Sequence, residues 1–155
     1  MTKKSDALAK KIASEMPNFL SAGSFLYRKE PILMMRGFAL DMPPGTCYIW
    51  KYYIPLFESV DFLNMSLGYR LSEGHIETGG KDAAQLASEA SRIVLDNDDF
   101  SDDETLEELI RFANDRRVAP TERARLFREL DCFKSEPLET ILNRAAANRE
   151  KLGIA

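Results

Sequence analysis

The chain has 155 residues, of which 45% are hydrophobic and 30% charged, and its net charge is −4. This length and composition fit one globular domain and differ from those of disordered or fibrous chains. No apolar run approaches the roughly 20 residues that span a bilayer, and the acidic balance argues against nonspecific nucleic-acid binding over the whole surface. We therefore expect a single domain over residues 1–155 that acts neither on membranes nor on nucleic acids.

The first predicted element is an amphipathic helix from Ser5 to Met16. Leu8, Ile12 and Met16 recur every fourth residue among lysines, which is the helical period. Pro17 then ends the helix. Residues 1–16 are charged and lack the apolar core of a signal peptide, so we expect a cytoplasmic protein. The two cysteines, Cys47 and Cys132, lie far apart and fit free thiols in a reducing compartment.

Four antiparallel strands are predicted next, because apolar, aromatic and β-branched residues crowd around turn signals. The turns contain Pro31, the run Pro43-Pro44-Gly45, and the short segment Glu58–Asp61. Such short connections predict a meander, since parallel neighbours need longer crossovers. Alternation is clearest from Leu63 to Leu71, and Trp50 is expected to be buried against helices. The predicted strands are Phe25–Glu30, Ile32–Met42, Thr46–Phe57 and Phe62–Leu71.

The half of the chain beyond Lys81 is predicted to be helical. Apolar faces begin near Ala83, Leu106, Leu126 and Leu138. Ser101 with Glu104 has the spacing of a capping box, and Pro120 and Pro137 suit first-turn positions. The fold class is therefore α+β, with an N-terminal helix, a four-stranded antiparallel meander and a helical C-terminal half.

The segment Ser72–Gly80 is expected to be a loop between the last strand and a helix. Its glycines resemble a phosphate-binding loop, but Gly80 separates Gly79 from Lys81 and Asp82 replaces the hydroxyl residue. His75, the only histidine, has no nucleophile motif beside it. We interpret the segment as a mobile turn with an exposed histidine, and we assign no catalytic residue.

Two charge clusters flank the third predicted helix. The acidic cluster from Asp96 to Glu104 lacks the central glycine of a calcium loop, so we assign it to a helix start and expect no metal or cofactor. The arginines between Arg116 and Arg128 lack interleaved aromatics, which argues against a nucleic-acid surface. We expect them to balance the acidic helix that precedes them.

The candidate partner-binding residues are Arg36, Lys51, Tyr53 and Arg70. If the central strands alternate as the last one does, these side chains share the more polar face of the sheet. Arginine and tyrosine are favoured at binding hot spots, and cations on an acidic protein would attract an acidic partner. The alternative is an ordinary solvated sheet face.

A family resemblance covers residues 25–71. Arg36-Gly37-Phe38, Trp50, Pro55-Leu56-Phe57 and Leu67-Gly68-Tyr69-Arg70-Leu71 resemble the strand pattern of an uncharacterised family of small bacterial cytosolic proteins. The resemblance implies an antiparallel α+β domain and brings no activity with it.

The expected function is that of a cytoplasmic protein–protein interaction module, of a chaperone-like or toxin-neutralising (immunity) type. The absence of a catalytic motif disfavours an enzyme, and the expected partner is another protein, of acidic character. The alternative is a small-molecule-binding protein or enzyme with a pocket between sheet and helices, on which His75 or Arg36 would converge. The sequence specifies no substrate, partner identity or oligomeric state.

Overall fold

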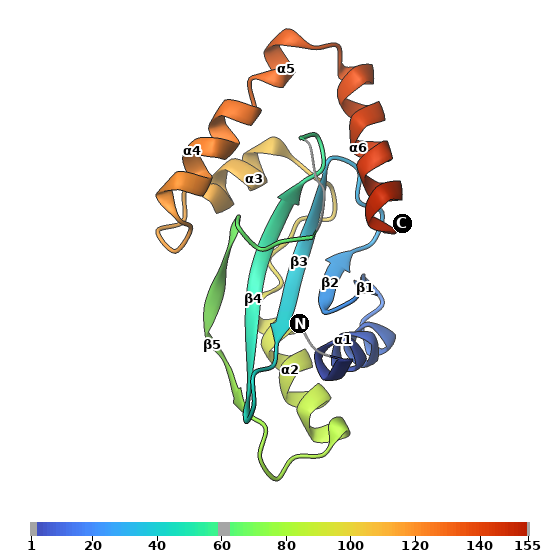
Figure 1. The fold of residues 1–155 in the computed structure, drawn as a ribbon, viewed down its shortest axis with the longest axis vertical. Coiled ribbons are helices and arrows are strands. Elements are labelled where there is room, and N and C mark those ends of the chain that lie inside the picture. The colour runs from blue at the N-terminus through green and yellow to red at the C-terminus, as the bar shows by residue number, and fades with distance from the viewer. Residues whose placement is uncertain (1–2, 59–62, 155) are drawn as a thin grey trace. The chain divides into compact units, whose positions relative to one another are not determined.

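A computed structural model describes residues 3–58 and 63–154 and confirms the α+β class, with an N-terminal helix, an antiparallel sheet and C-terminal helices (Figure 1). The elements follow the chain in the order α1 (Lys3–Glu15), β1 (Phe19–Ala22), β2 (Phe25–Arg28), β3 (Met34–Asp41), β4 (Thr46–Pro55), β5 (Gly68–Glu77), α2 (Ala83–Asn97), α3 (Leu106–Ala113), α4 (Pro120–Glu129), α5 (Cys132–Ser135) and α6 (Leu138–Leu152). Among the described residues, no helix is both long and apolar enough to cross a membrane.

The strands pair in sequential order, β1-β2-β3-β4-β5, as expected for a meander. The sheet has five strands rather than four, because Phe19–Ala22 forms an additional strand before the first predicted one. It pairs antiparallel with β2, with Ala22 opposite Phe25. Gly23, at a φ of 57°, and Ser24 form the tight connection between them. A glycine at positive φ is the usual signal of such a hairpin, but β1 is too short for its alternation to be recognised.

The last strand lies further along the chain than predicted. Its expected start, Phe62, is outside the described residues, residues 63–67 form no strand, and β5 instead continues through most of the expected Ser72–Gly80 loop. The buried positions shift by one residue between Leu71 and Gly74, as they do where a strand contains a bulge. A Cβ on Gly74 would lie 2.8 Å from the carbonyl oxygen of Ile49, so close approach to β4 explains this glycine within a strand.

The helix starts follow local chemistry that the sequence shows only in part. Pro120 is the first residue of α4, as expected, and Pro137 immediately precedes α6. The predicted capping box at Ser101 and Glu104 is wrong, because Thr105 caps α3 and accepts a hydrogen bond from the Glu108 N–H at 3.1 Å. A reciprocal capping box instead starts α2, where Asp82 and Gln85 exchange side-chain-to-backbone bonds.

The described residues form two compact units. The first comprises residues 3–29, 37–52 and 69–99, and the second comprises residues 30–36, 53–58, 63–68 and 100–154. Strands β3, β4 and β5 contribute residues to both units, so neither unit is one continuous segment. The expectation of a single domain stays a prediction.

Each unit has its own buried interior. In the first, the fully buried Tyr52 donates its hydroxyl to the Leu26 carbonyl at 2.8 Å. In the second, the ring of Phe57 packs edge-on against Phe133, with centroids 5.1 Å apart, and Asn148 donates to the Leu56 carbonyl at 2.7 Å. Both polar groups thus find partners when buried, which avoids the cost of an unsatisfied group.

Candidate functional site

A buried ion pair in the second unit joins the start of β3 to α3. Arg36 Nη1 donates to Glu108 Oε2 at 2.5 Å, and both side chains are 4% exposed. Ser101 donates to the other carboxylate oxygen, from its hydroxyl at 2.6 Å and from its backbone N–H at 2.7 Å. Burial favours the protonated form of Glu108, but the hydrogen bonds from Ser101 and Tyr53 and the charge of Arg36 outweigh it and lower the pKa of this carboxyl group.

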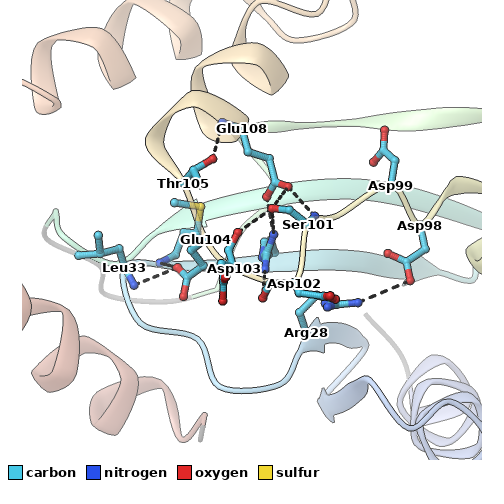
Figure 2. A network of polar contacts seen from close by, with 12 residues as sticks. Arg28, Leu33, Asp98, Asp99, Ser101, Asp102, Asp103, Glu104, Thr105 and Glu108 are labelled. Atoms are coloured by element: carbon cyan, nitrogen blue, oxygen red, sulfur yellow. Dashed lines mark hydrogen bonds and ion pairs between the residues drawn. The ribbon is translucent and has the colours of Figure 1, made fainter.

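Glu104 binds the backbone that leads into β3 (Figure 2). Its carboxylate accepts the N–H groups of Ile32 at 2.6 Å, Leu33 at 3.0 Å and Met34 at 2.7 Å. Burial raises the pKa of Glu104, although the three N–H groups and the charge of Arg36 oppose the shift. Three consecutive amides around one carboxylate resemble an anion-binding nest that the chain fills with its own side chain.

The acidic segment also pairs with cations in the first unit. Lys51 Nζ donates to the Asp99 carboxylate, and to the Asn97 carbonyl at 3.1 Å. Arg28 lies 3.8 Å from Asp98. Three members of the acidic cluster that the sequence assigned to a helix start, Asp98, Asp99 and Glu104, are therefore each placed against particular groups in their own unit. No group of three or more acidic, histidine or cysteine side chains among the described residues is arranged to hold a metal ion.

The expected exposure of the predicted partner-binding residues is wrong for three of the four. Arg36, Lys51 and Tyr53 are 3%, 5% and 2% exposed, whereas Arg70 is exposed. Arg36 and Lys51 are buried as ion pairs, because Glu108 neutralises the first and Asp99 neutralises the second. Tyr53 is buried because its ring packs against Phe100 and Phe112. Of the four residues, only Arg70 has a solvent-exposed side chain with which to contact a partner.

The more exposed side of β4 carries the aromatic residues that alternate with Lys51 along the strand. Cys47, Ile49 and Lys51 are buried, while Tyr48 and Trp50 are half-buried. Trp50 is thus less buried than the sequence suggested. Both parities of this strand are rich in apolar and aromatic residues, so the pattern alone does not show which side faces inward. Lys51 suggested the wrong side, because its charge is neutralised by Asp99 and the side chain is buried.

Arg70 from β5 lies over these aromatic rings within the first unit. Its guanidinium carbon is 3.9 Å from the centroid of the Tyr48 ring and 5.5 Å from that of Trp50, within cation–π range. His75, also on β5, stacks on Tyr48 with centroids 5.2 Å apart. We call Tyr48, Trp50, Arg70 and His75 the aromatic row.

The indole nitrogen of Trp50 is buried and has no hydrogen-bond partner in the described part of the chain. Native structures rarely leave a buried donor unpaired, and the cost is about 1–3 kcal/mol. The row therefore contains an unsatisfied donor beside an exposed guanidinium.

His75 lies on β5, a strand at the edge of the sheet. It is half-exposed in β5 rather than in a loop, and its Nε2 lies 3.2 Å from Glu77 Oε1. The resemblance to a phosphate-binding loop also fails structurally, since Asp82 caps α2 and Lys81 pairs with Glu89 at 2.6 Å. His75, Lys81 and Asp82 thus each have a partner within the chain.

The arginine cluster in the second unit makes structural contacts. Arg117 forms a two-pronged contact with Asp115, with Nε and Nη2 each 2.9 Å from a carboxylate oxygen. Arg123 donates to the Ala113 carbonyl at 2.6 Å, and Arg125 pairs with Glu58 at 2.5 Å. Arg117 and Arg123 thus hold the turn between α3 and α4. The ion pairs of Arg117 and Arg125 are made with Asp115, Glu58 and Glu122, which lie outside α3, so the expectation that the cluster balances the preceding acidic helix stays a prediction.

Comparisons of the chain with protein-family models, with curated proteins and with solved structures found no match. The resemblance over residues 25–71 therefore remains an expectation, and functional inference depends on the geometry of the chain itself.

Proposed function

We propose that this chain is a protein–protein interaction module whose partner contacts the aromatic row. The observation that carries the proposal is the position of Arg70, which is exposed over Tyr48 and Trp50 and makes no ion pair with a described residue. Tryptophan, tyrosine and arginine are the residues most enriched at binding hot spots. The row replaces the predicted set of Arg36, Lys51, Tyr53 and Arg70 and keeps its one exposed member.

An acidic partner suits this surface. The guanidinium of Arg70 presents several N–H donors at fixed angles, and a carboxylate accepts two of them at once. Its stacking on Tyr48 orders the side chain in advance, which lowers the entropy lost on binding. A partner that also supplied an acceptor to the Trp50 indole would remove the cost of its unpaired N–H.

The proposed setting is the cytoplasm, where free thiols persist. Cys47 and Cys132 are both free, and burial raises the pKa of Cys47 to about 11, which keeps this thiol protonated and unreactive. A chaperone-like or immunity-type module of bacterial cytosolic kind is the class that we propose.

Site-specific photocrosslinking tests the proposal. A photoreactive residue at Tyr48 should capture a protein that the same residue at Ala84, an exposed position on α2, does not capture. After mass-spectrometric identification, the purified partner should bind Arg70→Glu and Trp50→Ala at least tenfold more weakly, a loss of about 1.4 kcal/mol or more. Arg92→Glu is the matched control, because Arg92 is exposed on α2 outside the row.

Two results would reject the proposal. One is an identical set of captured proteins at Tyr48 and Ala84. The other is a partner that binds Arg70→Glu and Arg92→Glu equally well while circular dichroism shows both variants folded.

A further inference from the structure

The first unit contains a cavity of about 900 Å³ that the proposed function does not use. One stripe of α1, the turn between β3 and β4, and the start of α2 line it. Its apolar lining includes Leu8 from α1, Met42 and Pro43 from the turn, and Leu86 from α2. The volume lies in the upper part of the range of roughly 300–1,000 Å³ that is typical of small-molecule sites.

Lysines give the lining of this cavity a net positive charge. Lys3, Lys4 and Lys11 line it from α1, and none of them forms an ion pair with any residue that the structure describes. A fourth lysine, Lys81, pairs with Glu89 at 2.6 Å. The one acidic residue in the lining, Asp82, accepts the Gln85 N–H as the cap of α2 and does not contact these lysines by a hydrogen bond or ion pair.

The position of two of these lysines is unfavourable for α1 itself. Lys3 and Lys4 occupy its first turn, where the partial positive charge of the helix end repels cations and Asp6 is the single acidic residue. An anion in the cavity would relieve this repulsion. The arrangement therefore favours an anionic occupant over an empty cavity.

We propose that the cavity binds an amphipathic organic anion, an apolar chain that ends in a carboxylate. The chain would lie along Leu8, Met42 and Leu86, and the carboxylate would lie among Lys3, Lys4 and Lys11. A carboxylate suits the site better than a phosphate, because Asp82 already takes the Gln85 amide at the start of α2. Free amides at a helix start are what usually cradles a phosphate.

Calorimetric titration of the full chain with dodecanoate, below its micellar concentration, tests this proposal. Dodecanoate should bind saturably, and the affinity should fall as salt rises, because the lysines are exposed to screening. The triple variant Lys3→Gln, Lys4→Gln, Lys11→Gln should bind about tenfold more weakly or worse. Lys10→Gln should bind within twofold of the original chain, because Lys10 is exposed on the same helix but does not line the cavity.

A second pair of variants tests the apolar lining of the cavity independently of its charge. Ala83→Phe places a ring in the cavity lining and should abolish binding, whereas Ala84→Phe, one residue away and outside the lining, should not. Both alanines are exposed, so neither change disturbs a buried contact. Dodecyltrimethylammonium, with the same chain and the opposite charge, should not bind.

The proposal is overturned if dodecanoate does not bind, if Ala83→Phe and the triple lysine variant retain full affinity, or if the cationic amphiphile binds as well. Dodecyl phosphate that binds more than tenfold more tightly than dodecanoate would overturn the carboxylate assignment. The cavity and the aromatic row share no residue, so failure here leaves the proposed function standing.

Discussion

Arg36 and Glu108 form an ion pair that is almost wholly removed from water, with Nη1 and Oε2 2.5 Å apart and both side chains 4% exposed. Removing one partner of such a pair leaves an uncompensated buried charge. Glu108→Ala should therefore lower the free energy of unfolding by about 3–5 kcal/mol, measured by urea denaturation. Glu107→Ala is the matched control, since Glu107 is the exposed neighbour on α3 and should cost no more than about 0.5 kcal/mol.

Replacing both partners with apolar residues separates the charge effect from packing. The double variant Arg36→Met, Glu108→Leu should recover most of the loss, because the desolvation cost disappears along with the attraction. A double variant that is as unstable as Glu108→Ala would show that the hydrogen bonds from Ser101, rather than the charge balance, dominate.

Gly37 on β3 faces the backbone of β2 in the first unit, opposite Tyr27. An added Cβ would lie 1.9 Å from the Leu26 carbonyl oxygen and 3.0 Å from the Tyr27 Cα. Because both atoms belong to backbone, neither can swing aside, and Gly37→Ala should cost about 3 kcal/mol or more. In Gly79→Ala, the control, the new Cβ meets no atom within 4 Å, so equal stability of the two variants would refute the argument.

Glu104 and Glu108 should titrate in opposite directions from their ordinary pKa of 4.5. The pKa of Glu104 is raised, chiefly by burial, and that of Glu108 is lowered, because hydrogen bonds and Arg36 outweigh its burial. The folded chain thus holds the Glu104 proton more tightly than the unfolded chain does. The stability that this group contributes is present below pH 4.5, and it is lost as the pH rises through the pKa of Glu104 in the folded chain.

For Glu108 the pH dependence is reversed. Its contribution to stability is present above pH 4.5 and is lost as the pH falls through its lowered pKa. Carboxyl-carbon NMR titration measures both groups directly. Urea denaturation of Glu104→Gln between pH 4 and 7 should show the original chain losing stability relative to the variant as the pH rises. A Glu104 resonance that titrates below 4.5 would contradict the predicted order.

Elements of the fold were predictable where the spacing of apolar residues along the sequence matches the spacing of buried positions. The helical faces beginning at Ala83 and Leu106 coincide with α2 and α3, because one apolar stripe per helix suffices to define them. The last strand was misplaced because Ser72, Glu73 and His75 are polar, and an edge strand tolerates such residues on its exposed side.

The candidate site was only partly predictable, because charge alone does not indicate exposure. Arg36 and Lys51 had the sequence signature of surface cations, yet each meets a carboxylate at least 48 residues away in the chain. No local pattern encodes such a pairing. Arg70 was placed correctly because its neighbours Tyr69 and Leu71 alternate with it in burial, which fixes the outward direction from adjacent residues alone.

Trp50 is the only tryptophan, so fluorescence reports on the aromatic row without interference. Because the side chain is half-buried rather than fully buried, acrylamide should quench it readily in the isolated protein, and Trp50→Ala should cost about 2 kcal/mol rather than the roughly 3–5 kcal/mol of a core aromatic. Arg70→Ala should increase the quenching constant, because the guanidinium lies 5.5 Å from the indole centroid and shields one face of the ring. Arg92→Ala should leave it unchanged. Emission that resists quenching in the original chain and in Arg70→Ala alike would mean that the indole is inaccessible in solution, and the aromatic row would then lose its central contact.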